Sequence, residues 1–360
     1  MIWTILLFFV VLSVLVIAHE WGHYAAAKKI GADVEEFGLG FPPRIFTWKG
    51  KDGMIWSFNA IPIGGFVKIR GESGQDRSGP GSFAIKSIFQ RLFVLAAGVI
   101  MNLVLAAALF SVGFLVGIPA ITEGGVSNAA IVQNEAIRVA EILSGSAGDE
   151  AGLQLGDTLV SIDGQEFETS QQARDALVAQ DQDQTFQVTV LRDDEMLELT
   201  ANPKMEEGYD REILGIALLE TGTVRYPVHL APLKGVETTY IYTRDISVAF
   251  YQIIKNLIVG EDPGVELSGP VGIAVMTGEV ASMGFVYLLQ FSAILSINLA
   301  IINILPFPAL DGGRIFFVMI EAVRRKPTSP EFEAVVHNLG FVVLMLLVIF
   351  VTYKDILGLL

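Results

Sequence analysis

The chain contains no cysteine, so it can form neither a disulfide bond nor a thiolate metal site. Any transition metal that it binds must therefore be held by histidine and carboxylate side chains. Basic residues are also scarce, with 24 Lys and Arg against 39 Asp and Glu in 360 residues. Because the sequence lacks a basic stripe that could neutralise phosphates, we expect no nucleic-acid partner.

Apolar residues are abundant instead. They make up 52% of the chain, and the mean hydropathy is +0.54. These values are typical of a membrane protein that carries a water-soluble insert. The acidic residues are concentrated in the middle of the chain, where 27 of the 39 lie between Glu123 and Glu279. An acidic, solvated module is therefore flanked by apolar segments.

Four apolar segments approach the length of about 20 residues that a membrane-spanning helix needs. They are residues 2–24, 92–118, 285–305 and 335–353. The first has no basic region before it and no small-residue cleavage site after it, so we interpret it as a retained helix and not as a signal peptide. A shorter, glycine-rich stretch at residues 267–278 is expected to lie at the membrane interface.

The positions of Lys and Arg predict the orientation of these helices. Residues 24–91 carry ten basic side chains, and four more follow the third apolar segment. Both of these loops are therefore expected in the cytoplasm, with the acidic module and both termini on the opposite side. The predicted location is the bacterial cytoplasmic (inner) membrane.

His19, Glu20 and His23 form an H-E-x-x-H motif at the end of the first apolar segment. Residues four apart lie on one face of a helix, so both imidazoles can reach one metal ion. Glu20 is placed to act as a general base on a water molecule. Chance occurrence on an ordinary helix is the competing explanation, but ionisable groups in apolar segments are costly and usually functional.

Asp311 is the best candidate for a third ligand. It follows Pro306 and Pro308, which break the third apolar segment, and it precedes two glycines. This places a carboxylate at the depth of His19 and His23, although Asp311 could also cap the next helix. The other histidines are weaker candidates: His229 is expected on the opposite side of the membrane, and an interfacial or capping role is expected for His337.

Two further regions suggest how a substrate could be recognised. Residues 54–69 read as short strands with a turn, which either pair with an extended substrate or form a plain cytoplasmic hairpin. The run from Ala151 to Gly164 resembles a bacterial PDZ domain, which either binds peptide ends by strand addition or acts only as a steric plug.

The H-E-x-x-H motif, the N-x-x-P-x-P-x-L-D-G-G run at residues 303–313 and the PDZ-like insert together resemble the site-2 protease family. The similarity is greatest to its bacterial RseP-type branch, and it covers nearly the whole chain. The resemblance implies zinc held by His19, His23 and Asp311, with Glu20 as base. It implies that Asn303 binds the substrate backbone or steadies the oxyanion.

The resemblance also assigns a substrate-binding role to four residues: Gly64, Gly65, Phe66 and Asn102. Gly98 and Asn102 match a G-x-x-x-N element of the family, although small residues there could simply allow close helix packing. The chain departs from some family members in having a single PDZ-like unit where they carry two.

We therefore expect an α-helical polytopic membrane protein with four transmembrane helices, a membrane-associated β element and an inserted α+β PDZ domain. The expected division is 1–24 first transmembrane helix, 25–91 cytoplasmic loop with the β element, 92–120 second transmembrane helix, 121–205 PDZ domain, 206–284 amphipathic linker, 285–311 third transmembrane helix, 312–334 cytoplasmic loop and 335–360 fourth transmembrane helix.

The predicted function is hydrolysis of peptide bonds in the transmembrane segments of single-pass membrane proteins, such as anti-sigma factors or remnant signal peptides. Other expected partners are membrane lipid and a peptide ligand of the PDZ domain. A second hypothesis is a membrane adaptor with a structural metal, but such sites normally have four protein ligands. A metal transporter is a weaker third hypothesis, because no further intramembrane carboxylates or histidines line a path.

Overall fold

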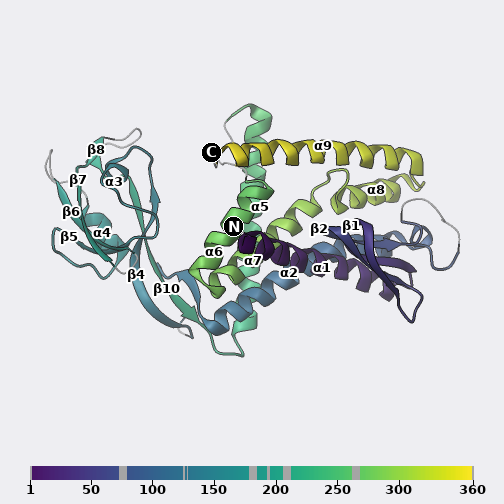
Figure 1. The fold of residues 1–360 in the computed structure, drawn as a ribbon, viewed down its shortest axis with the longest axis horizontal. Helices are drawn as coiled ribbons and strands as arrows, with labels where there is room; N and C mark the ends of the chain where they lie inside the picture. The colour runs from purple at the N-terminus through teal and green to yellow at the C-terminus, as the bar shows by residue number, and fades with distance from the viewer. Residues whose placement is uncertain are drawn as a thin grey trace. The chain divides into compact units, whose positions relative to one another are not determined.

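The computed structural model describes residues 2–72, 79–124, 126–127, 129–177, 185–192, 195–205, 212–261 and 268–358. The chain divides into two compact units (Figure 1). Unit 1 comprises residues 1–113 and 229–360, and unit 2 comprises residues 114–228. Unit 2 is thus an insertion into unit 1.

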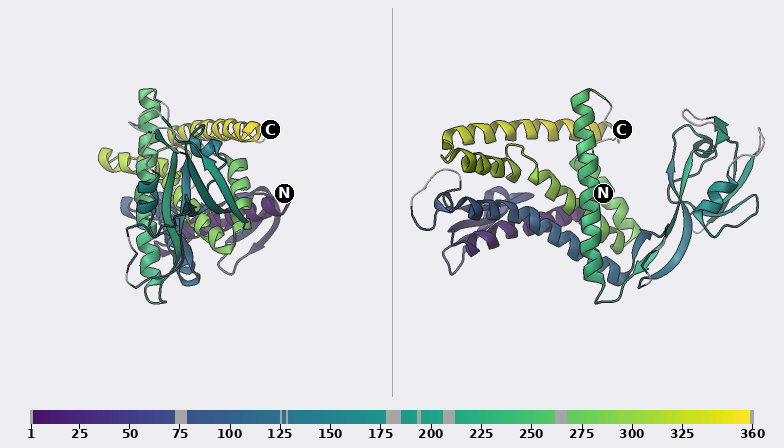
Figure 2. Two further views of the ribbon diagram at one scale, coloured as in Figure 1. Left: turned by 90° about the vertical axis from the view of Figure 1, so that its left-hand side faces the viewer. Right: turned by 180° about the vertical axis from the view of Figure 1, so that it is seen from behind.

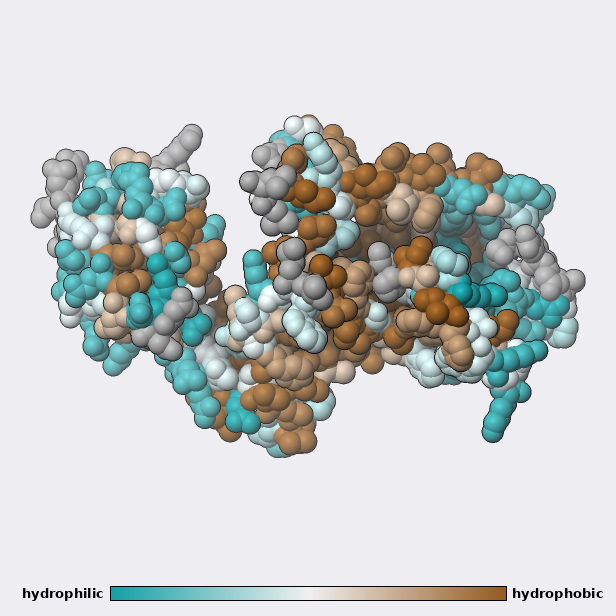
Figure 3. All heavy atoms as spheres, in the orientation of Figure 1, coloured by the Kyte–Doolittle hydropathy of each residue, from teal (hydrophilic) through white to brown (hydrophobic). Residues whose placement is uncertain are grey.

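Unit 1 is built mainly from helices. These are α1 (Ile2–Lys29), α2 (Ile88–Val116, which ends in unit 2), α5 (Ala231–Val259), α6 (Pro270–Met283), α7 (Phe285–Ile304), α8 (Asp311–Arg324) and α9 (Pro330–Gly358), with a 3-10 turn η1 (Phe83–Ile85). Figure 2 shows α5 as one unbroken helix. Among the described residues, four helices are long and apolar enough to cross a membrane: α1, α2, α7 and α9. Apolar residues cover much of the helical face in Figure 3.

These four helices correspond to the four segments expected from the sequence. The chain is therefore a multi-pass membrane protein with an added sheet region. Three of the helices are longer than the apolar runs, since α1 continues to Lys29, α2 already begins at Ile88 and α9 spans Pro330–Gly358. Helix α7 ends at Ile304, one residue before the expected limit. The short stretch at 267–278 overlaps α6, which is joined to α7 through Gly284.

The β element consists of β1 (Val34–Lys49) and β2 (Ile55–Ile69). Both strands change partner along their length. Residues 34–39 lie between residues 55–58 and residues 65–69, and residues 44–49 pair with the outer side of residues 55–59. In the register that the structure describes, residues 65–69 pair on one side only. This leaves them at an edge, next to α1.

Unit 2 contains a six-stranded sheet in the order β3-β10-β4-β5-β6-β7. Its elements are β3 (Ile118–Ile121), β4 (Ile131–Ile142), α3 (Ala147–Glu150), β5 (Thr158–Ile162), α4 (Ser170–Ala176), β6 (Phe186–Arg192), β7 (Glu195–Ala201) and β10 (Ile216–Arg225), with a separate pair β8 (Lys204–Met205) and β9 (Glu212–Ile213). Alternate residues of β6 point into the core, where Phe186, Val188 and Val190 are buried.

The sheet extends unit 2 beyond the expected domain limits of 121 and 205. β10 lies in the range that we expected to be an amphipathic linker, and it pairs with both β3 and β4. The expected limit at residue 205 adjoins residues outside the described ranges. From Ala231 to Val259 the same range forms helix α5.

An ion pair fixes α8 against α2. Arg91 at the start of α2 donates two hydrogen bonds to the Glu321 carboxylate in α8, at 2.8 and 2.9 Å. Both side chains are more than four-fifths buried. This bidentate geometry restrains both the distance and the orientation of the two helices. Helix α8, which begins with Asp311, is therefore held against α2, which packs on α1.

A second ion pair lies inside unit 2. The buried carboxylate of Asp157 accepts hydrogen bonds from Arg192 at 2.6 and 2.7 Å and from the backbone N–H of Gln154 at 2.8 Å. Burial acts to raise the pKa of Asp157, but these hydrogen bonds outweigh it and hold the pKa below its usual value. The ionised carboxylate therefore stabilises the fold of unit 2.

We predict that Asp157→Asn lowers the stability of unit 2 by about 2 kcal/mol at pH 7, because charged hydrogen bonds of this kind contribute about that much. Since the folded-state pKa is depressed, the contribution is complete above the ordinary carboxyl pKa of about 4 and is lost as the pH falls below it. Hydrogen exchange of the β5 and β6 amides in the full-length protein measures the effect.

The matched control is Asp175→Asn on the exposed face of α4, which should leave exchange unchanged. Equal protection of the β5 and β6 amides in the wild type and in Asp157→Asn, at both pH 7 and pH 3.5, would contradict this account.

Candidate metal centre

The side chains of His19, His23 and Asp311 meet in unit 1. His23, the nearer histidine in the sequence, is 288 positions from Asp311. The Nε2 atoms of His19 and His23 lie 3.1 Å apart. Oδ2 of Asp311 lies 3.0 Å from the first and 3.1 Å from the second. The structure therefore brings together the three residues that the sequence predicts as metal ligands.

The hydrogen bond on the far side of His23 fixes its protonation. Nδ1 of His23 lies 2.9 Å from the carbonyl oxygen of Val94, which can only accept. Nδ1 must therefore carry the proton and donate, which leaves a lone pair on Nε2 in the neutral ring. That lone pair faces the carboxylate of Asp311, another acceptor. Two acceptors at such a distance need either a proton on Nε2 or a metal ion between them.

His19 has a matching partner in Asn102, which is fully buried. The side-chain amide of Asn102 lies 3.3 Å from Nδ1 of His19, and its Oδ1 has no partner among the described residues. The two ends of an amide are nearly interchangeable in shape. With Oδ1 turned toward the ring, His19 donates from Nδ1, the orphaned oxygen is satisfied, and Nε2 keeps its lone pair for a metal.

The donor set fits zinc. Zinc takes imidazole nitrogen and carboxylate oxygen at about 2.0–2.2 Å, so ligand atoms in a tetrahedral site lie about 3.3 Å apart. The observed separations of 3.0 and 3.1 Å are close to that value. Three protein ligands also match the arrangement of a catalytic zinc, which keeps one position for water or substrate.

Two glycines allow α1 and α2 to approach closely enough to form the site. A Cβ atom on Gly22 would collide with the carbonyl oxygen of Ala97 in α2. A Cβ atom on Gly98 would collide with Nε2 of His23 and would lie 2.8 Å from Nε2 of His19. The G-x-x-x-N element thus borders the two imidazoles directly. The sequence suggested close helix packing but gave no signal for this contact.

Local sequence explains where Asp311 stands. Helix α7 ends at Ile304, and α8 begins at Asp311 itself, with Leu310 as the residue before it. Asp311 is therefore in the first helical turn and makes no capping hydrogen bond. Gly312 and Gly313 lie so close to the backbone at residues 304–307 that a Cβ at either would collide with it. The bend is compact only because both are glycine.

Glu20 lies beside the β element. An ideal Cβ on Gly65 would be 3.4 Å from Cγ of Glu20 and 3.1 Å from Val16. The neighbouring Gly64 has a φ of +85°, which favours glycine, and it lies against the ring of Phe41. The predicted strand residues are therefore next to the predicted base, at the free edge of residues 65–69.

The remaining predicted residues are placed differently. Phe66 pairs with Gly38 across the sheet, and its ring lies against that glycine. Asn102 is buried against His19, so its position favours holding the imidazole over touching a substrate. Asn303 is in the last turn of α7 and, among the described residues, makes no hydrogen bond to the three candidate ligands.

Comparison with known proteins agrees with this geometry. The chain matches peptidase family M50 over residues 7–347. It is 31% identical to zinc metalloprotease RasP of Geobacillus kaustophilus, covering 98% of this chain and 97% of that protein. It is 29% identical to regulator of sigma-W protease RasP of Bacillus subtilis, covering 98% of each.

A solved PDZ domain of an SdrC-like protein from Listeria monocytogenes matches 24% of this chain and 92% of its own, with 19% identity and a TM-score of 0.22. The PDZ prediction for unit 2 therefore continues to rest on its sequence motif.

The chain belongs to peptidase family M50, the site-2 protease family. It is a metalloprotease of the site-2 type, and its relatives' names indicate zinc as the metal. Its four apolar helices fit an intramembrane protease.

We predict that Gly98→Ala lowers the zinc affinity of the protein by at least about tenfold, because displacing the imidazoles disrupts the ligand set. Zinc competition with a chromogenic chelator measures this in detergent. Gly358→Ala in α9, where a Cβ would meet nothing within 4 Å, is the matched control. Unchanged zinc affinity in Gly98→Ala would show that the two imidazoles do not hold the metal in the observed arrangement.

Proposed function

We propose that this protein hydrolyses peptide bonds within or beside the transmembrane segments of single-pass membrane proteins, using a zinc ion held by His19, His23 and Asp311. The convergence of these three side chains beside Glu20 is the observation that carries the proposal. Bound there, zinc supplies a Lewis acid that polarises the scissile carbonyl and lowers the pKa of an attacking water.

The protein's own residues divide the remaining work. The Glu20 carboxylate accepts a proton from the attacking water and returns it to the leaving amine. The proposed role of Asn303 is to donate a hydrogen bond from its amide to the developing oxyanion. Because Asn303 makes no hydrogen bond to the candidate ligands, its amide is available to a bound substrate.

The free edge of residues 65–69 supports a model for substrate binding. A helical substrate hides its carbonyls in its own hydrogen bonds, so it must unwind locally before water can attack. An extended segment can replace those bonds by pairing with a strand edge. The edge at Gly65 lies against Glu20, which favours substrate pairing over the plain hairpin that the sequence also allowed. Gly64 and Phe66 belong to the same segment.

The proposed topology follows the distribution of basic residues. Residues 24–91 and the segment after α7 face the cytoplasm, unit 2 lies outside, and the metal centre lies near the cytoplasmic side of a bacterial inner membrane. Anti-sigma factors are the proposed substrate class, which is consistent with the name of the Bacillus subtilis relative, regulator of sigma-W protease RasP. Remnant signal peptides fit the same chemistry. Unit 2 would exclude uncleaved substrates with bulky external domains or bind a peptide end.

An adaptor with a structural metal is less well supported. Among the described residues, the candidate ligand group has three members, whereas structural zinc sites normally have four. The close approach of Gly65 to Glu20 also has no purpose in a purely structural site.

We predict that Glu20→Gln abolishes cleavage of a tagged panel of single-pass membrane proteins while zinc binding is kept. The substitution removes the proton acceptor but none of the three ligands. Cleavage is followed on gels in reconstituted vesicles, with and without a zinc chelator, and zinc is counted in the purified variant.

Glu279→Gln, the same chemical change at an exposed residue of α6, serves as the control and should cleave normally. Full activity in Glu20→Gln would refute the assignment of the base. Chelator-resistant cleavage by the wild type would refute the metal mechanism.

A further inference from the structure

The loop that presents Asp311 contains an unfavourable backbone conformation. Ala309, two residues before Asp311, has a φ of +81°. This is the left-handed region, which residues with a Cβ atom rarely occupy unless their surroundings hold them there. The direction in which Asp311 leaves the loop therefore depends on contacts outside the loop.

Helix α9 provides those contacts. The backbone N–H of Ala309 donates a hydrogen bond to Nδ1 of His337, at 3.0 Å. One turn further along α9, the buried Gly340 lies so close to Pro308 that a Cβ would be 2.7 Å from its carbonyl carbon. His337 and Gly340 are three residues apart and share a face. This face of α9 contacts the loop at two consecutive residues, Pro308 and Ala309.

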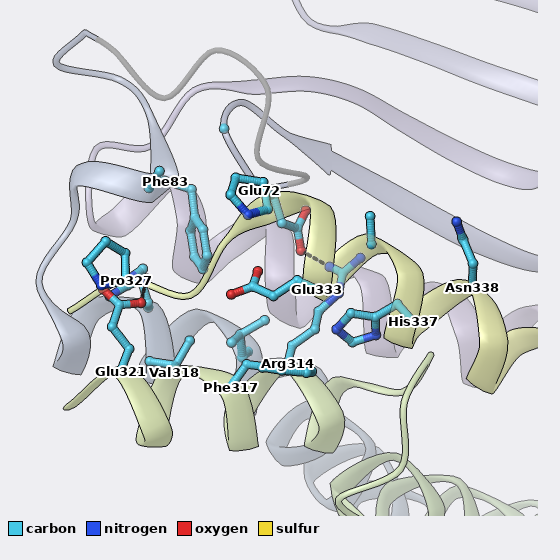
Figure 4. A pocket seen from close by; sticks show the side chains of 16 residues that line it. Glu72, Phe83, Arg314, Phe317, Val318, Glu321, Pro327, Glu333, His337 and Asn338 are labelled. Carbon is cyan, nitrogen blue, oxygen red and sulfur yellow. Dashed lines mark hydrogen bonds and ion pairs between the residues drawn. The ribbon is translucent and has the colours of Figure 1, made fainter. Parts of the chain in front are cut away.

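The ring of His337 is itself held in place. It packs on Phe317 of α8, with the ring centroids 5.5 Å apart. His337 and Phe317 both line a cavity of about 420 Å³ that α8, α9 and the start of α2 help to form (Figure 4). Arg314 and Glu333 line the same cavity. A ring fixed in this way presents Nδ1 to Ala309 in one orientation.

We infer that His337 is a positioning residue for the metal centre: its Nδ1 accepts the Ala309 N–H and so fixes the loop conformation that aims Asp311 at His19 and His23. His337 does not itself join the ligand group, whose members are the two α1 histidines and Asp311. The role differs from the interfacial or capping role expected from the sequence. The inference rests on the proposed metal centre.

The test compares two replacements that differ in one property. Oδ1 of asparagine and Nδ1 of histidine are both bonded to Cγ, so His337→Asn keeps an acceptor at a similar reach. His337→Leu keeps comparable bulk but leaves the half-buried Ala309 N–H without its His337 acceptor. We expect His337→Leu to lose zinc affinity by at least about tenfold in chelator competition, and His337→Asn to stay within about threefold of the wild type.

Three accompanying measurements make the result specific. Asn338→Leu changes the next residue on α9, which lines the same cavity, and should bind zinc normally. The zinc-free His337→Leu and His337→Asn variants should unfold at similar temperatures, so that a difference in stability does not explain their difference in zinc affinity. Proteolysis at saturating zinc should show a reduced kcat for His337→Leu with little change in KM.

Equal zinc affinity in the wild type and His337→Leu would overturn the inference. Equal loss in His337→Leu and His337→Asn would also overturn it, because ring packing and not the acceptor would then be responsible. Asp311→Ala is measured in parallel. If Asp311→Ala binds zinc normally, the proposed metal centre itself fails, and this outcome is distinct from a failure confined to His337.

Discussion

The arrangement of this protein depends on three acceptor atoms held about 3 Å apart, two imidazole nitrogens and one carboxylate oxygen. Such atoms repel one another unless a proton or a metal ion lies between them. Helix α1 supplies two of the atoms through simple helical periodicity. The third comes from α8, so the fold must bring α1 and α8 together although they are far apart in the sequence. The specific contacts of α1, α2 and α8 in unit 1 hold these three atoms together.

Lipid provides little apolar driving force between helices, so shape and polar contacts must determine how they assemble. Gly22 and Gly98 remove the side chains that would keep α1 and α2 apart, and the imidazoles occupy the space that Gly98 leaves. The Arg91 and Glu321 pair then fixes α8 against α2. Each contact is specific in geometry, which an apolar interface alone would not be.

The sequence predicted the features that arise from local patterns. Helical spacing predicted that His19 and His23 share a face, and the proline break after the third apolar segment predicted that Asp311 joins them. Contacts between distant segments could not be predicted in this way. The pairing of β10 with β4 joins residues about 80 apart, and it extends unit 2 past the limit that local composition suggested. The contact of Gly98 with the imidazoles and the bond from Ala309 to His337 are equally non-local.

The division into two units separates the metal centre from the insert. Every residue that forms or orients the metal centre, from His19 to His337, belongs to unit 1. Unit 2 enters between residues 113 and 229, and its own core and its Asp157 ion pair are internal to it. Catalytic geometry is therefore fixed without any ligand from the insert. The surface of unit 2 can therefore change in evolution while the geometry of the metal centre stays constant.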